Sequence, residues 1–233
     1  HQMRPPYPFD TTTFLAELGK LGISSYRGMA LAEELYVKGY ISYPRTDNTV
    51  YPRGLGLRAI LDELERSDLK DDATRLKAVT DFRPTRGPRE ATDHPPIHPT
   101  QGARRSDLSP EQWRVYELVA RRFMATIAPP AEISATHVKL DAADEPFVSH
   151  GDIVASRGWL DFYPYTKVEE RRIPEMRAGD SIDVLSISLR TDKTRPPARY
   201  SESKLLREMA SLNLGTKSTR HEIIQKLHER KFI

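Results

Sequence analysis

The sequence predicts a mixed α and β protein built from several domains, and three observations support this class. Residues 1–132 carry apolar side chains at helical spacing, residues 133–195 carry them at alternate positions, and residues 196–233 return to helical spacing. The changes fall at the proline pairs Pro129-Pro130 and Pro196-Pro197, which mark segment boundaries. We therefore expect a helical first domain, a β-rich segment, and the start of a second helical domain.

The composition is that of a folded protein with a heavily solvated surface. Of 233 residues, 38% are apolar and 30% are charged, and the formal net charge is only +3. The chain has no cysteine, which excludes disulfides and thiolate metal sites and is typical of a reducing cytosol. No apolar run approaches the roughly 20 residues of a membrane span. The chain opens on His1 and stops in mid-pattern at Ile233, so we expect it to be part of a longer protein.

Two short helices are expected after a proline-rich lead-in of ten residues without periodicity. A helical pattern runs from Thr13 to Leu21, and Gly22 ends it. Ser24 or Ser25 can cap the second helix, and Gly39 suits the left-handed position that follows its last turn. Two helices of this kind followed by a short strand are typical of a helix-turn-helix or winged-helix unit.

The first candidate site lies directly after these helices, in the stretch Tyr40–Thr49. Pro44 favours an extended conformation for Tyr43, so that the phenol is presented outside a helix. Residues two apart in an extended segment point to the same side, so we expect Arg45 beside Tyr43. A guanidinium can hold a phosphodiester through two N–H bonds while a phenolate attacks phosphorus. The alternative is a half-buried tyrosine at a strand end with a surface arginine.

The rest of the first domain predicts two helices around a loop. Apolar spacing predicts a helix from Leu57 to Glu65, and the cap-and-proline pair Ser109-Pro110 starts another. The many prolines within residues 66–110 predict a loop docked on the neighbouring helices, with Asp71-Asp72 in a solvated turn.

This loop carries the second candidate site in the string DHPPIHPT, residues 93–100. His94 has the chemistry to donate to a phosphate oxygen or to protonate a leaving group. Metal binding by His94 and His98 is one alternative, but no convincing third ligand lies near them in the sequence. The other alternative is a loop histidine that hydrogen-bonds the backbone. The acidic residues show no two-metal pattern, and there is no glycine-rich loop for ATP.

Short strands are predicted by alternating apolar residues between residues 133 and 190, with a phase slip at Leu185 that indicates a bulge. We expect further strands of this sheet or barrel to lie outside the chain. The expected strands are marked by Thr136–Leu140, Phe147-Val148, Ile153-Val154, Trp159-Leu160, Ile182–Val184 and Ile187–Leu189.

The last segment predicts two helices, and the third candidate site lies between them. Free N–H groups at a helix start, together with hydroxyls and cations, suit a nucleic-acid phosphate. Thr219 and Glu222 fit a capping box, and a simple N-cap is the alternative role for Thr219. The two helices also repeat the pattern of residues 15–41 in residues 206–233. The candidate phosphate contacts are Lys217, Ser218, Thr219 and Arg220.

Together these three sites resemble the signatures of type IA DNA topoisomerases. GYISYPRTDNT (39–49) is similar to the family's active-site motif, and DHPPIHPT (93–100) looks like its second signature. GTKSTRHEIIQKL (215–227) resembles its third signature. The forms of the first two are most similar to the archaeal topoisomerase I and topoisomerase III branch, and the resemblance covers essentially the whole chain.

The resemblance implies that Tyr43 is the nucleophile of a 5′-phosphotyrosine intermediate and that Arg45 holds the scissile phosphate. It places His94 near that phosphate, and the third signature in a groove for single-stranded DNA. It also implies a winged-helix-like tyrosine domain over residues 1–132, part of a β-rich arch over 133–195, and the start of a helical DNA-binding domain over 196–233.

The same resemblance implies that parts of the enzyme lie elsewhere. The family's Toprim domain, with its acidic Mg²⁺ site, has no counterpart here. We therefore expect magnesium as a cofactor of the complete enzyme, no metal ligand in this chain, and little cleavage by the chain alone.

The expected partners are single-stranded DNA and the Toprim and remaining domains of the same polypeptide. We expect no membrane association, a monomer, a cytoplasmic and nucleoid-associated location, and ATP-independent relaxation of negative supercoils. The alternatives are a non-catalytic winged-helix DNA-binding module that uses Lys217 and Arg220, and a purely structural arm.

Overall fold

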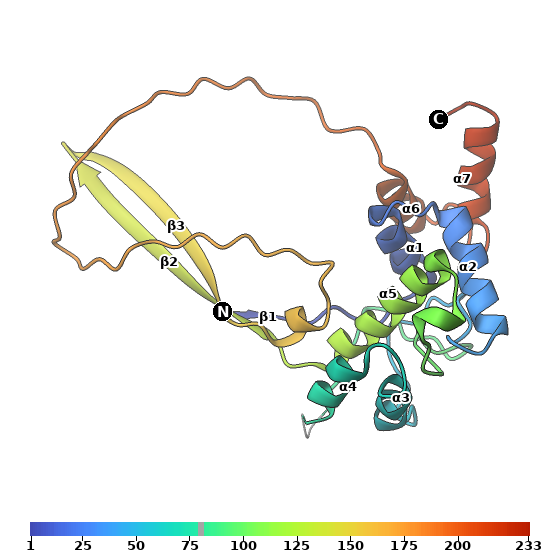
Figure 1. Ribbon diagram of the computed structural model, residues 1–233. Coiled ribbons are helices and arrows are strands. Elements are labelled where there is room, and N and C mark those ends of the chain that lie inside the picture. The colour runs from blue at the N-terminus through green and yellow to red at the C-terminus, as the bar shows by residue number, and fades with distance from the viewer. Residues whose placement is uncertain (79–81) are drawn as a thin grey trace.

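A computed structural model describes residues 1–78 and 82–233 of the chain. A helical body carries a projecting β-hairpin, and a long extended segment runs from the base of the hairpin back to the last two helices (Figure 1). The elements are β1 (Gln2–Met3), α1 (Thr11–Lys20), α2 (Ser25–Val37), α3 (Leu57–Leu64), α4 (Lys70–Lys77), α5 (Pro110–Ile127), β2 (Ala131–Ala142), β3 (Glu145–Ser156), α6 (Glu202–Ser211) and α7 (Arg220–Glu229).

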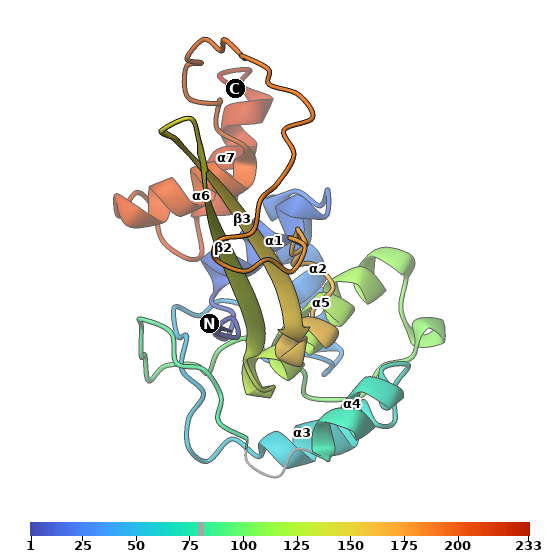
Figure 2. The ribbon, with the colours of Figure 1, turned by 90° about the vertical axis from the view of Figure 1, so that its left-hand side faces the viewer.

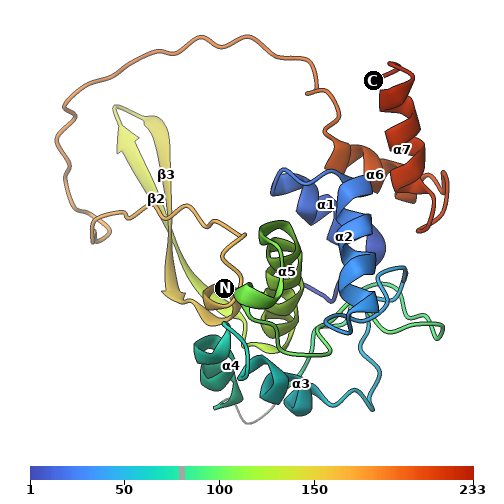
Figure 3. The same ribbon diagram turned by 45° about the vertical axis from the view of Figure 1, so that its right-hand side comes forward.

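The core lies where α1, α2 and α5 meet, and α6 and α7 pack on the outside of α1 and α2 (Figure 3). Phe14, Leu35, Tyr116 and Phe123 are fully buried there, so burial of large apolar side chains fixes the relative positions of these helices. In the described part of the chain, no helix combines the length and the apolar character that crossing a membrane requires.

The predicted helix ends are confirmed where a local capping interaction sets them. Ser24 accepts a hydrogen bond from the main-chain nitrogen of Arg27 at the start of α2. Ser109 and Gln112 form a capping box around Pro110 at the start of α5. Gly39 takes the left-handed conformation expected after α2, with φ of +79°.

The internal repeat has the same hydrogen bonds in both copies. The first copy contains α1 and α2, and the second contains α6 and α7. After each of these four helices, a main-chain nitrogen donates to the carbonyl five residues earlier. A left-handed residue precedes the donor in all four cases. The bonds run from Ile23 to Leu18 and from Leu214 to Met209, and from Tyr40 to Leu35 and from Phe232 to Leu227.

The expectation of an unbroken loop over residues 66–110 was wrong at its start, where α4 forms. Its first turn holds Asp71 and Asp72 and its last turn holds Arg75 and Lys77, so charges of both signs favour the helix dipole. Residues 66–77 contain no proline or glycine, and the prolines that break helices begin at Pro84. Asp71-Asp72 is therefore a helix start and not a solvated turn.

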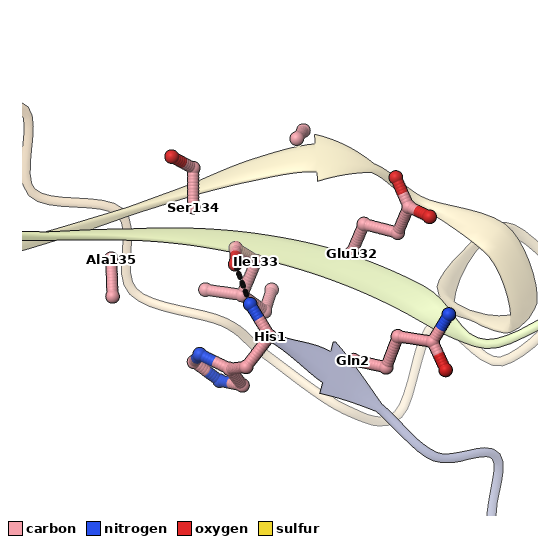
Figure 4. A pocket seen from close by; sticks show the side chains of 7 residues that line it. His1, Gln2, Glu132, Ile133, Ser134 and Ala135 are labelled. Atoms are coloured by element: carbon pink, nitrogen blue, oxygen red, sulfur yellow. Dashed lines mark hydrogen bonds between the residues drawn. The ribbon is translucent and has the colours of Figure 1, made fainter.

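The β segment forms a single long hairpin that points away from α3 and α4 (Figure 2). β2 and β3 pair antiparallel, with His137 opposite His150. β1 adds a short third strand within the lead-in, where no regular structure was expected. There the main-chain nitrogen of His1 donates to Ile133 at 2.7 Å, beside a shallow pocket (Figure 4).

The strands predicted at Trp159-Leu160 and within residues 182–189 are absent from the described residues. Trp159-Leu160 lies in a 3₁₀ turn over Gly158–Asp161, where both side chains are buried against the helical body. Residues 182–189 have no regular structure, and the bulge expected at Leu185 does not form. A strand needs hydrogen-bond partners along its length, and no described segment lies beside these residues as a second strand.

The loop that follows α4 is docked on α3 and α5, as expected, and Gly102 makes the close approach possible. The hydroxyl of Tyr116 accepts from the main-chain nitrogen of Ala103 at 3.1 Å and donates to the carbonyl of Gln101 at 2.8 Å. At Gly102, the Cβ of any other residue would overlap the carbonyl oxygen of Glu63 at the end of α3. This docking holds the far end of the DHPPIHPT string in place.

We expect Gly102→Ala to lower the free energy of unfolding by about 2 kcal/mol, because the main chain must shift to admit the methyl group. Urea unfolding of the purified protein measures this loss. Gly54→Ala is the matched control, since nothing lies within 4 Å of its added Cβ. Equal stability of the two variants would contradict the close packing at Gly102.

Candidate active site

The extended segment around Tyr43, residues 42–46, is held between two other parts of the chain. On one side, the hydroxyl of Thr11 donates to the carbonyl of Pro44 at 2.7 Å and accepts from the nitrogen of Thr46 at 2.8 Å. On the other side, the nitrogen of Ser42 donates to the carbonyl of His98 at 2.9 Å. The hydroxyl of Thr46 reaches the carbonyl of His94 at 3.2 Å. The first and second signatures therefore run side by side.

This pairing places the ring of Tyr43 against two other rings. His94 lies with its ring centroid 4.8 Å from that of Tyr43, and Tyr36 of α2 packs edge-on at 5.2 Å. Tyr43 is half-buried, while His94 and Tyr36 are exposed. The imidazole of His94 therefore lies beside a partly accessible phenol.

Arg45 turns toward α2 and toward the third signature. Its Nε donates to Oε1 of Glu33 at 2.8 Å, and Nη2 donates to the same oxygen. Its Nη1 donates to the main-chain carbonyl of Ser218 at 3.2 Å. Arg45 therefore connects the tyrosine segment to the loop before α7, and the described hydrogen bonds of its guanidinium go to Glu33 and Ser218.

Lys217 forms a second connection between the same segments. Its Nζ lies 2.7 Å from a carboxylate oxygen of Asp93 and 3.6 Å from one of Asp47. Partial burial acts to lower the pKa of Lys217, but the hydrogen bond to Asp93 and the charges of Asp47 and Asp93 raise it overall. The hydrogen bond from Lys217 lowers the pKa of Asp93. One lysine thus joins residues from all three signatures.

The other third-signature residues shape their own loop. The hydroxyl of Thr219 accepts from the nitrogen of Thr216 at 2.9 Å, and no side chain caps the start of α7. The predicted capping box between Thr219 and Glu222 was therefore wrong, because Thr216 takes the hydroxyl instead. Ser218 is half-buried and faces Arg45 with its carbonyl.

Arg220 is 7% exposed and is engaged within the fold. Its Nε donates to Leu214 at 3.0 Å, Nη2 donates to Gly215 at 3.1 Å, and Nη1 donates to the hydroxyl of Thr12 at 3.3 Å. These bonds brace the loop against α1. Contact between Arg220 and DNA stays a prediction.

Two more histidines lie close to this face, and both are buried. His98 has its Nδ1 2.7 Å from the carbonyl of Pro96, and burial lowers its pKa. His98 is therefore a loop histidine that hydrogen-bonds the backbone, which is the alternative role for a histidine of the second signature. Burial, and then the nearby charge of Arg45, lower the pKa of His221, whose Nδ1 has no partner among the described residues.

The acidic partners Glu33, Asp47 and Asp93 were missed by the sequence analysis. Asp47 lies inside the first signature and Asp93 inside the second, so their places in these motifs could have identified them. Glu33 lies in the middle of α2 and carries no such signal. Within residues 1–78 and 82–233 no group of three or more acidic or histidine side chains is arranged to hold a metal ion.

The chain matches known proteins over nearly its whole length. The profile of the DNA topoisomerase family matches residues 1–233. The chain is 48% identical over 228 residues to DNA topoisomerase 1 of Archaeoglobus fulgidus, covering 98% of this chain and 34% of that protein. It is 33% identical over 233 residues to DNA topoisomerase 3 of Caenorhabditis elegans, covering 98% of this chain and 30% of that protein.

The solved structure of full-length topoisomerase I from Thermotoga maritima has the same fold over 99% of this chain and 39% of its own, with a TM-score of 0.77 at 24% identity. The chain spans about a third of the length of the relatives it matches. Because the family profile matches it from end to end, the chain belongs to the type IA DNA topoisomerase family.

Proposed function

We propose that this chain supplies the cleaving tyrosine of a type I DNA topoisomerase, an isomerase that acts on single-stranded DNA. One observation carries the proposal: Tyr43 and His94 lie ring against ring, and Arg45 bridges from the same segment to the third signature. An imidazole from a distant part of the sequence thus lies against the ring of Tyr43, and the guanidinium two residues further along the chain contacts the third signature. A half-buried tyrosine at a strand end would not require these neighbours.

In the proposed reaction the Tyr43 oxygen attacks a backbone phosphorus. A phosphorus–oxygen bond to Tyr43 forms with a 5′ phosphate, the bond to the 3′ oxygen breaks, and the phenol proton is transferred so that a 3′-hydroxyl leaves. Attack by that hydroxyl reverses the step and rejoins the strand. One phosphodiester replaces another, so relaxation of negative supercoils needs no ATP.

Arg45 and His94 supply part of the stabilisation. A phenol is a weak nucleophile until it loses its proton, so attack requires a base or a strong positive field. The guanidinium can hold phosphate oxygens while charge develops on them, and the imidazole can donate a further hydrogen bond.

Magnesium is proposed as a cofactor of the complete enzyme, bound outside this chain. Asp47 and Asp93 face Lys217, and the acidic residues that the structure describes are not grouped to hold a metal ion. The proposed partners within the same polypeptide are a Toprim domain and the remaining parts of the DNA groove.

The finer features of the predicted organisation are also part of the proposal. They are a winged-helix-like tyrosine domain over residues 1–132, an arch segment over 133–195 and the start of a DNA-binding domain over 196–233. A monomeric, cytoplasmic and nucleoid-associated enzyme is the corresponding prediction for the whole protein.

We expect Tyr43→Phe to abolish the covalent adduct with single-stranded DNA, because the attacking oxygen is removed. The measurement uses a full-length enzyme that contains this chain, magnesium and a labelled oligonucleotide, and traps the adduct with denaturant. Tyr36→Phe is the matched control, since it keeps the ring that packs on Tyr43. An adduct formed by Tyr43→Phe would show that another residue is the nucleophile. DNA binding without any adduct in the unaltered enzyme would favour a non-catalytic binding module.

We expect Lys217→Ala to weaken binding of single-stranded DNA and to reduce the slope of log affinity against log salt by about 0.7, the value for one phosphate contact. Asp93→Asn should strengthen binding several-fold, because it frees Lys217 and removes a charge that repels phosphate. Fluorescence anisotropy over a range of salt concentrations measures both effects. Unchanged slopes in both variants would show that Lys217 does not contact the DNA backbone.

A further inference from the structure

Glu33 determines which hydrogen-bond donors of Arg45 remain for a ligand. A guanidinium has five N–H donors: one on Nε and two on each terminal nitrogen. The bonds to Glu33 use one donor on Nε and one on Nη2, and the bond to Ser218 uses one on Nη1. One N–H therefore remains on each terminal nitrogen of Arg45.

These two remaining N–H donors of Arg45 are enough to bind a phosphate through two of its oxygens. Two N–H groups on different nitrogens of a guanidinium can bind two oxygens of one phosphate at the same time. Glu33 and a phosphate can thus bind Arg45 together, on different edges of the same planar group. The carboxylate need not leave for the phosphate to enter.

The position of Glu33 is set by a rigid helix. Its neighbours Ala32 and Leu35 are fully buried in the core, so the main chain of α2 cannot move freely at this point. Tyr36, one turn further along α2, packs on the ring of Tyr43. The same part of α2 therefore contacts both Tyr43 and Arg45.

The pair contributes little to folding stability. The side chain of Glu33 is 41% exposed and that of Arg45 is 22% exposed, and ion pairs with this exposure add little to the free energy of unfolding. A role in orienting Arg45 explains the paired contacts better than a structural role does.

We propose that Glu33 is a positioning residue: it holds the guanidinium of Arg45 so that two N–H donors face the phosphate that Tyr43 attacks. This inference rests on the proposed function. The opposite possibility is that Glu33 masks Arg45 and competes with the phosphate, which predicts the reverse effect of its removal.

The test measures the rate of adduct formation by the full-length enzyme in a single turnover, at saturating single-stranded DNA and at low DNA concentration. We expect Glu33→Ala to slow the saturated rate between tenfold and a hundredfold, since misplacement of a catalytic group by about 1 Å costs up to roughly a hundredfold. Glu33→Gln keeps an oxygen acceptor for Nε and should recover most of the rate. The melting temperature should not change in either variant.

Glu111→Ala is the matched control, because it breaks a comparable exposed ion pair between Glu111 of α5 and Arg27 of α2, the helix that carries Glu33. In an Arg45→Ala background, Glu33→Ala should have no further effect on the rate. A Glu33→Ala enzyme that is as fast as the control, or faster, would overturn the positioning role. That outcome is distinct from failure of the proposed function, in which Tyr43→Phe would still form the adduct.

Discussion

The arrangement of the candidate site depends on the hydrogen bonds that hold the segment around Tyr43, residues 42–46, between Thr11 and the second signature. Thr11 binds this segment through its hydroxyl and its main-chain nitrogen, and the carbonyls of His94 and His98 bind it from the opposite side. Thr46 is fully buried at the centre, so its polar groups cannot exchange these partners for water. Leaving one such group without a partner costs about 1–3 kcal/mol, and the contact between Tyr43 and His94 follows from this constraint.

The cations of the site are balanced by acids of the same chain. Arg45 faces Glu33, and Lys217 faces Asp93 and Asp47, although the whole chain is basic with a pI near 9.0. In the proposed function, Arg45 and Lys217 therefore add little to the long-range electrostatic attraction of nucleic acid. Their acidic neighbours fix where their N–H donors point, and such donors favour the specific placement of a backbone phosphate over tight, indiscriminate binding.

Helix ends could be predicted from the sequence, while long-range pairing could not. Gly22, Gly39 and Ser109 act through hydrogen bonds a few residues away, so short strings carry their information. Residues 182–189 alternate like a strand, but a strand also needs a partner that the local pattern does not encode. The contact of Glu33 with Arg45 depends on how α2 packs against the extended segment, and an exposed helical glutamate has no distinguishing pattern. The burial of Arg220 depends on the fold of the whole loop before α7, so its hydrogen bonds to Leu214, Gly215 and Thr12 could not be predicted from a short string.

Two contacts join the loop before α7 to the segment around Tyr43: the hydrogen bond from Arg45 to the carbonyl of Ser218, and the ion pair between Lys217 and Asp47. Binding free energies at sites joined in this way are reciprocal. A ligand that displaces the loop alters the hold on Arg45, and a phosphate held by Arg45 alters the affinity of the loop by the same factor. The loop before α7 and the segment around Tyr43 are therefore coupled through Arg45, since the carbonyl of Ser218 accepts one of its N–H groups.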